Sequence, residues 1–166
     1  MAKKNEIKYN ILSKTANNYG TFAFTKDNVN YVGNAFAVVY GMDDDEFKAA
    51  IEKSKAVQMD DVDKIKIVTE HIANIKKNGK KAIYTRVCFN STNGLVHFFQ
   101  TDPCMFITLY DNLYALVKDL TIDSMIGNNK TGGIVFGSGN KEILILPMKL
   151  KLNNGVENVL NKLLEG

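Results

Sequence analysis

The segment from Lys81 to Leu120 constrains the fold more than any other part of the chain, because strand-forming and turn-forming stretches alternate in it at short spacing. β-Branched and aromatic residues dominate 82–90 and 95–101, and Asn93-Gly94 between them tolerates the positive φ values of a two-residue hairpin turn. Asp102-Pro103 interrupts the second strand, since proline has no amide hydrogen to donate to a ladder. The segment therefore predicts a hairpin followed by a further strand.

A helix is predicted to follow at 111–120. Asp111 is placed to accept the free amide hydrogens of the first turn. The apolar residues behind it recur at spacings of three and four, as one face of a helix requires: Leu113, Leu116, Val117 and Leu120.

The rest of the chain also reads as short strands and helices. Strands are predicted at 6–12, 21–25, 29–32, 35–40, 122–126, 134–136 and 142–150. Helices are predicted from Asp43 to about Lys55, from Asp61 to Asn78 and, as an amphipathic segment, over 153–164. Asp43 and Glu46 have the spacing of a capping box, and Gly79 suits the C′ position of the long helix.

The two halves of the chain repeat one plan. Residues 24–53 and 89–120 each give a strand, a turn, two more strands and an acid-capped helix. This order indicates either an internal duplication with pseudo-twofold symmetry or two copies of a common local arrangement. We predict a single α+β domain over 1–166, with a mixed or antiparallel sheet of hairpins backed by helices.

Composition indicates a cytoplasmic globular protein. Hydrophobic residues make up 45% and charged residues 23% of the 166 residues, which is ordinary for a soluble domain. No apolar run approaches the roughly 18 residues of a membrane span, and the charged start does not read as a secretory signal. Cys88 and Cys104 sit within apolar strands without paired spacing, so we expect buried free thiols in a reducing compartment.

Motifs that would carry catalysis or metal binding are sparse. His71 and His97 have no partner at a recognisable spacing. Cys88, His97 and Cys104 could face one another across the hairpin, but structural zinc favours close ligand pairs and a catalytic thiol favours an exposed helix start. The acids 43–46 are consecutive, so on a helix they spread around the axis instead of converging on a metal.

The glycine-rich turns do not change this conclusion. Gly132-Gly133 and Gly137-Ser138-Gly139 lack the Lys-Ser/Thr ending of a phosphate loop and precede strands. The sequence therefore predicts no enzyme, no cofactor and no metal site.

A set of basic residues supplies the candidate binding surface. The net charge is only +3, but basic residues gather where the long helix meets the central strands, and others alternate along the last strand. All except Arg86 are lysines, which contact phosphate as point charges and read bases poorly. We predict contacts with the duplex DNA backbone through Lys76, Lys77, Lys80, Lys81, Arg86, Lys149 and Lys151.

The final strand, 142–150, ends in Leu-Pro-Met-Lys-Leu and resembles the closing strand of bacterial DNA sliding clamps, which run into Met-Pro-Met-Arg-Leu. Residues 111–120 look like the short helix before the last strands of a clamp domain, and the order of elements over 62–150 is similar to that domain's duplicated plan. The resemblance implies a clamp-like fold and a role as a DNA-replication or phage-type accessory protein.

The chain also departs from clamps. It has room for one domain where clamps carry two or three, and a helix at 153–164 follows the closing strand. Ring formation by several copies and polymerase binding are therefore left open. The leading hypothesis is a non-enzymatic, clamp-like protein, encoded by a phage or mobile element, that binds DNA or a replication protein.

Two other hypotheses stay open. One is a small inhibitor or adaptor, for example an anti-defence protein, that binds a host protein through Asp43–Phe47 and the helix at 153–164. The other is an enzyme whose site the sequence does not reveal.

Overall fold

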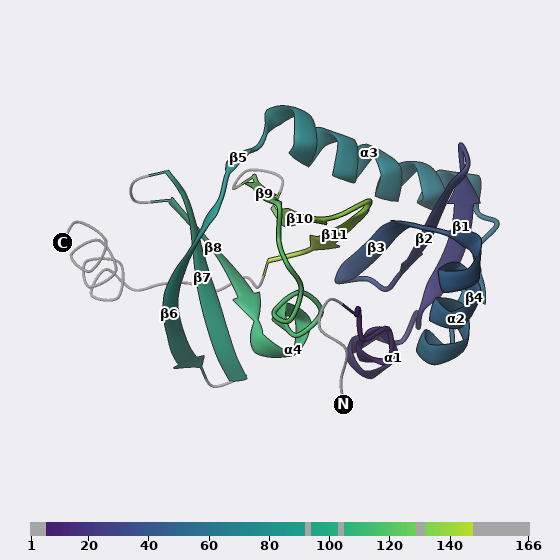
Figure 1. The fold of residues 1–166 in the computed structure, drawn as a ribbon, viewed down its shortest axis with the longest axis horizontal. Helices are drawn as coiled ribbons and strands as arrows, with labels where there is room; N and C mark the ends of the chain where they lie inside the picture. Colours follow the sequence, from purple (N-terminus) through teal and green to yellow (C-terminus); the bar gives the residue numbers. More distant parts are fainter. Residues whose placement is uncertain (1–5, 92–93, 103–104, 129–131, 148–166) are drawn as a thin grey trace.

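The computed structural model describes residues 6–91, 94–102, 105–128 and 132–147. They form helices and two β-sheets, so the predicted α+β class with a mixed sheet is confirmed, although the strands divide between two sheets where one was predicted (Figure 1).

The larger sheet has eight strands in the described part of the chain, in the spatial order β4-β1-β2-β3-β11-β10-β9-β5. All neighbouring pairs are antiparallel except β4 with β1. The strands are β1 (Phe22–Lys26), β2 (Val29–Gly33), β3 (Ala37–Met42), β4 (Val57–Gln58), β5 (Lys80–Lys81), β9 (Ser124–Gly127), β10 (Ile134–Ser138) and β11 (Lys141–Ile145). Asp27 and Asn28 join β1 to β2 with φ values of 53° and 65°, as a two-residue hairpin turn between the strands predicted at 21–25 and 29–32 requires.

The smaller sheet is the central hairpin and the strand after it, β6 (Ile83–Ser91), β7 (Gly94–Asp102) and β8 (Met105–Tyr110). Ser91 pairs with Gly94, so the predicted hairpin is confirmed, while 92–93 and 103–104 lie outside the described residues. The chain passes directly from the larger sheet to the smaller one at Ala82, whose amide donates to the Met125 carbonyl at 2.9 Å.

Helix α3 (Val62–Asn78) covers one face of the larger sheet, and the shorter helices lie on the other side (Figure 1). These are α1 (Asn10–Thr15), α2 (Asp44–Ser54) and α4 (Asp111–Tyr114). Under α3, Ile72 and Ile75 pack with buried residues of the sheet such as Val135 and Leu144. No helix among the described residues is long and apolar enough to cross a membrane.

The main core lies between the larger sheet, the smaller sheet and the short helices. Phe99 of β7 meets Phe136 of β10 edge to face, with ring centroids 5.8 Å apart. The two sheets come close together at Gly127, where an added Cβ would lie 2.8 Å from the Ile107 Cδ1 atom. The absence of a side chain at Gly127 therefore lets the Ile107 side chain of the smaller sheet pack closely against β9.

The capping predictions were largely confirmed. The Asp43 carboxylate accepts the Glu46 amide at 2.8 Å, and Asp61 caps α3. Glu46 does not return the capping-box bond and instead accepts from Tyr9 and Lys141. Gly79 ends α3 as predicted but with φ of −79°, so it is needed for space and not for a left-handed conformation.

The predicted strand at 6–12 is wrong, because this segment enters helix α1. Tyr9 and Leu12 are three residues apart, and one helical turn buries both side chains in the main core. The buried side chain of Asn34 then ties the helix to the β2–β3 connection by donating to the Leu12 carbonyl at 2.9 Å.

The predicted helix over 111–120 is wrong beyond Tyr114. The chain continues in tight turns, in which Leu116 and Leu120 amides donate to carbonyls three residues earlier. These turns still bury the apolar face that the spacing predicted, including Leu113 and Val117. Asp111 makes no capping bond, because its carboxylate binds His97.

The predicted echo between the halves is present as an order of elements. Strands β1, β2 and β3 lead to α2, and strands β6, β7 and β8 lead to α4. The first set belongs to the larger sheet and the second forms a sheet of its own. Duplication therefore stays an interpretation.

Replacing Asn34 with Ala should lower the free energy of unfolding by about 2–4 kcal/mol, because buried backbone groups lose their partners. The Asn34 amide group donates to Leu12 and Thr15, and its oxygen accepts the Phe36 and Ala37 amides. Urea unfolding measures the change. Asn90→Ala on the exposed surface of β6 is the control and should have almost no effect. Equal effects of the two substitutions on the free energy of unfolding would contradict a structural role for the Asn34 hydrogen bonds.

Tyr9→Phe should make the protein less sensitive to alkali. Burial and then the hydrogen bond to Glu46 raise the pKa of the Tyr9 hydroxyl far above its ordinary value of 10.0. The unfolded chain therefore releases this proton first, and the stability that Tyr9 contributes is intact below pH 10 and is lost as pH rises above it. In urea titrations between pH 9 and about pH 11, the variant should lose less stability than the unmodified chain, by about 1.4 kcal/mol over the whole interval. Tyr19 is 87% exposed, so the Tyr19→Phe control should lose stability with rising pH as the unmodified chain does. If Tyr9→Phe also lost stability as steeply as the unmodified chain, Tyr9 would not contribute to the alkaline sensitivity.

Candidate functional site

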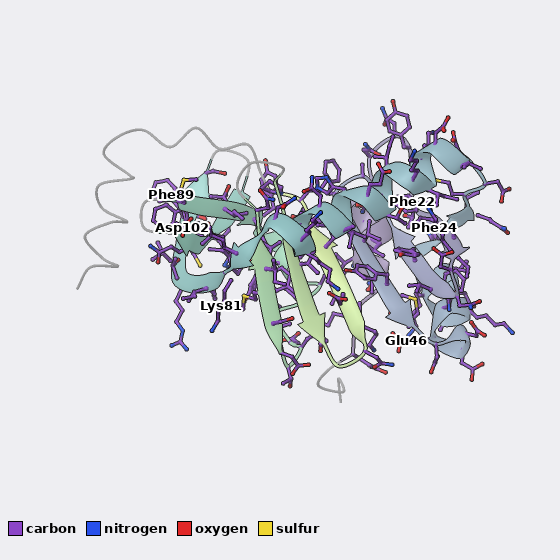
Figure 2. The ribbon with its side chains drawn as sticks, turned by 90° about the horizontal axis from the view of Figure 1, so that it is seen from above. Phe22, Phe24, Glu46, Lys81, Phe89 and Asp102 are labelled. Atoms are coloured by element: carbon purple, nitrogen blue, oxygen red, sulfur yellow. The ribbon has the colours of Figure 1, made fainter. Side chains whose placement is uncertain are left out.

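The predicted basic residues lie at the end of α3, on β5 and on β6, but acids neutralise part of the set. Lys76 pairs with Glu142 at 2.7 Å and Lys80 with Asp102 at 2.8 Å. The prediction missed both pairs because each acid is far from its lysine in the sequence. Figure 2 shows Lys81 near the end of the molecule that carries Asp102 and Phe89.

Three predicted cations have no acid partner among the described residues: Lys77, Lys81 and Arg86. All three are exposed. Lys149 and Lys151 lie outside the described residues, as does the predicted helix at 153–164. The structure thus leaves a basic surface of three side chains where five were predicted on the described segments.

The surface predicted around Asp43–Phe47 is exposed in part. Asp43, Asp44 and Asp45 are exposed, but Phe47 packs against the main core and Glu46 binds the Lys141 ammonium at 3.0 Å. Among the described residues, no group of three or more His, Cys, Asp or Glu side chains could hold a metal ion.

A cleft that no sequence pattern indicated lies at the opposite end of the molecule, between α3 and the edge strand β4. Its volume is about 700 Å³. Figure 2 places Phe22, one of its lining residues, at the end away from Phe89 and Asp102. We call it the β4–α3 cleft, and its main apolar lining residues are Tyr19, Phe22, Val57, Met59, Ile67 and Val68.

Several of these apolar side chains are unusually exposed. Tyr19 is 87%, Val57 72% and Ile67 67% exposed. A smaller groove of about 240 Å³ shares Phe22 and Val68 with the cleft and extends it along α3 toward His71. An apolar channel of this kind is a typical place for a partner or ligand to bind.

Strand β4 presents an open backbone edge beside the cleft. In the described part of the chain the larger sheet ends at β4, and the Val57 and Met59 amides donate inward to carbonyls of Thr21 and Ala23 at 2.9 Å. Successive residues of a strand point their backbone groups to opposite sides, so the amide and carbonyl of Gln58 point to the open edge. This edge can accept another extended chain.

The described charged residues that line the cleft are mostly acidic. Asp60 and Asp61 line it, against a single lining cation, Lys64, among the described residues. Asp61 also caps α3, and the Asp60 carboxylate accepts from Gln58 at 3.4 Å. The acidic end therefore complements a basic residue on whatever binds there.

The two histidines and Cys88 have polar partners, and the exposure of Cys88 differs from expectation. His71 Nε2 donates a hydrogen bond to the Gly132 carbonyl at 3.1 Å, which places His71 at the border of the buried face of α3. Cys88 is exposed, which makes the prediction of a buried thiol wrong, because β6 is the edge strand of the smaller sheet. Cys88 does face His97, as the hairpin allows, while Cys104 lies outside the described residues.

Comparisons with known proteins do not identify a relative. No protein-family model matches the chain, and no curated protein or solved structure matches it either. The similarity to sliding clamps therefore stays a prediction from the sequence.

Proposed function

We propose that this protein is a binding module that recognises an extended peptide segment of a partner protein at the β4–α3 cleft. The observation that carries the proposal is the combination of an apolar channel with an open strand edge. An extended peptide uses both, since its backbone pairs with β4 while alternate side chains enter the cleft. This corresponds to the adaptor hypothesis, at a different surface from the one expected at Asp43–Phe47.

The chemistry of the cleft defines the peptide. Exposed Tyr19, Val57 and Ile67 require apolar side chains at alternate positions. Asp60 and Asp61 favour a Lys or Arg at one end. A second copy of this chain would bring the same acids together and is disfavoured for that reason.

Ile67→Glu should weaken peptide binding at least ten-fold, because it places a charge where an apolar side chain would be buried at a gain of about 1.5–3 kcal/mol. The probe is a random peptide library displayed on phage and selected on the immobilised chain, with the affinities of selected peptides measured by fluorescence polarisation. Selected sequences should combine alternating apolar residues with a Lys or Arg.

Ile83→Glu is the matched control, since Ile83 is 60% exposed on β6 at the other end of the molecule. It should leave affinity unchanged. Failure to enrich any such peptide, or equal loss of affinity in the two variants, would overturn the proposal.

The second candidate function is contact with the backbone of duplex DNA, which Lys77, Lys81 and Arg86 favour, since they are exposed and have no acid partner among the described residues. Phosphate contacts release counterions, so each lysine that binds should contribute about one unit to the slope of log affinity against log salt. Lys76 and Lys80, which already pair with acids, should contribute less.

Replacing Lys77 and Lys81 together with Gln should therefore flatten the salt slope by about two units for a short duplex of mixed sequence. The Lys76→Gln, Lys80→Gln variant has the same change in charge and serves as the control, with a smaller effect. Absence of binding at low salt, or equal effects of the two double variants, would exclude this surface.

A further inference from the structure

The smaller sheet carries a thiol, an imidazole and a carboxylate in one hydrogen-bonded row. The Cys88 Sγ atom lies 3.2 Å from His97 Nδ1, and His97 Nε2 lies 2.7 Å from Asp111 Oδ1. The two contacts use opposite nitrogens of the ring, so the thiol and the carboxylate act on one base from its two sides. The three side chains are therefore arranged for proton transfer along the row, and they do not converge on one point as metal ligands would.

Asp111 selects the tautomer of the His97 ring. An ionised carboxylate only accepts hydrogen bonds, so the neutral ring carries its proton on Nε2, and its Nδ1 lone pair faces the Tyr84 hydroxyl and the Cys88 thiol. Tyr114 stacks on the imidazole with ring centroids 4.4 Å apart, and the His97 side chain is only 10% exposed. The base is therefore largely buried and held in orientation, while the thiol beside it is exposed to substrate and water.

A two-residue bulge in β6 brings Cys88 opposite His97. Three residues separate Tyr84 from Cys88, whereas one residue separates their partners Phe99 and His97 on β7. Without the bulge, Arg86 would pair with His97 and Cys88 would lie further along the strand. Because side chains alternate between the two faces of a sheet and the number of extra residues is even, Cys88 stays on the same face of the sheet as His97.

The bulge holds an unfavourable backbone conformation. Arg86 has φ of 62°, which a residue with a side chain rarely adopts. Thr85 closes the bulge, because its hydroxyl donates to the Phe98 carbonyl at 2.8 Å and accepts the Val87 amide at 3.1 Å. Strain of this kind collects at functional sites, and a regular hairpin would avoid it.

Tyr84 adds a hydrogen-bond donor beside the thiol. Its hydroxyl lies 2.7 Å from His97 Nδ1 and 3.4 Å from Cys88 Sγ. Burial, and next the hydrogen bond to Cys88, raise the pKa of Tyr84, so the hydroxyl stays protonated at neutral pH. Once the thiol proton has moved to Nδ1, this hydroxyl is free to donate to the sulfur.

We propose that Cys88 is the nucleophile of an acyl-transfer site, with His97 as its base and Asp111 as the residue that positions His97. His97 takes the thiol proton, and the Cys88 thiolate attacks the carbonyl carbon of an acyl donor. The bond from that carbon to the leaving group breaks, and His97 returns the proton to the leaving group. The product is a Cys88 thioester, which water attacks with His97 again accepting a proton, so that the carboxylic acid and the free thiol are regenerated.

The substrate class follows from the donors beside the sulfur. Tyr84 is the side-chain donor that the described contacts place next to Sγ, so stabilisation of a developing oxyanion is limited. The site therefore suits thioesters and activated esters, whose leaving groups depart readily, over amides. This activity is separate from peptide binding, since Cys88 lies in the smaller sheet and the β4–α3 cleft at the edge of the larger one.

The test uses the full chain with Cys104→Ser, so that Cys88 is the remaining thiol. 4-Nitrophenyl acetate should release a burst of 4-nitrophenol equal to the amount of protein, with the acetyl group found on Cys88 by mass spectrometry. Alkylation of the same Cys104→Ser chain with iodoacetamide should abolish the burst, because it blocks the Cys88 thiol. A missing burst, or acetylation at other residues only, would overturn the proposal.

Substitutions then distinguish the base from a structural histidine. His97→Asn should slow acetylation of Cys88 on the order of a hundred-fold, and Asp111→Asn on the order of ten-fold. His97→Ala should regain part of the rate when free imidazole is added, which a purely structural role does not predict. Acetylation at an unchanged rate in His97→Asn, or no response to imidazole in a folded His97→Ala variant, would show that Cys88 reacts as an ordinary thiol.

Discussion

The pairing of β3 with β11 is the contact on which the rest of the structure depends. It joins segments about a hundred residues apart and places the β10–β11 hairpin inside the larger sheet. Both strands are buried on two faces, since Val39 and Ile143 enter the main core while Val38 and Leu144 lie under α3. Continuous apolar runs of this kind can be satisfied only in the middle of a sheet covered on both sides. The position of α3 on one face and of the smaller sheet on the other follows from that requirement.

The β4–α3 cleft and the Cys88 site both lie at edge strands, where the regular pairing of the sheets is short or interrupted. Strand β4 has two residues, and its short length leaves apolar side chains such as Val57 beside an unpaired backbone edge. Strand β6 is an edge strand whose bulge turns Cys88 toward His97. The central strands, buried on both faces, leave no room for either feature. Edges and irregularities therefore carry the candidate functions, and the packed centre holds them apart.

Local chemistry made much of the fold predictable. Neighbouring residues alone determine the break between the strands predicted at 21–25 and 29–32 and the caps at Asp43 and Asp61, and the structure confirms all three. The segments 6–12 and 115–120 were predicted wrongly because their apolar residues are buried by distant elements that override the local pattern. The basic surface was overestimated for a similar reason, as Glu142 and Asp102 are remote in sequence from the lysines that they neutralise.

The sequence by itself determined the α+β class, the central hairpin and most element boundaries, because turns, caps and apolar spacing act over a few residues. Only the tertiary structure decided that Asp111 binds His97 instead of capping its helix, and that Cys88 faces that histidine from an exposed strand. It also decided that Tyr19, Val57 and Ile67 line one cleft. These contacts join residues from separate elements, and their distances depend on how the two sheets and α3 pack, which no local pattern encodes.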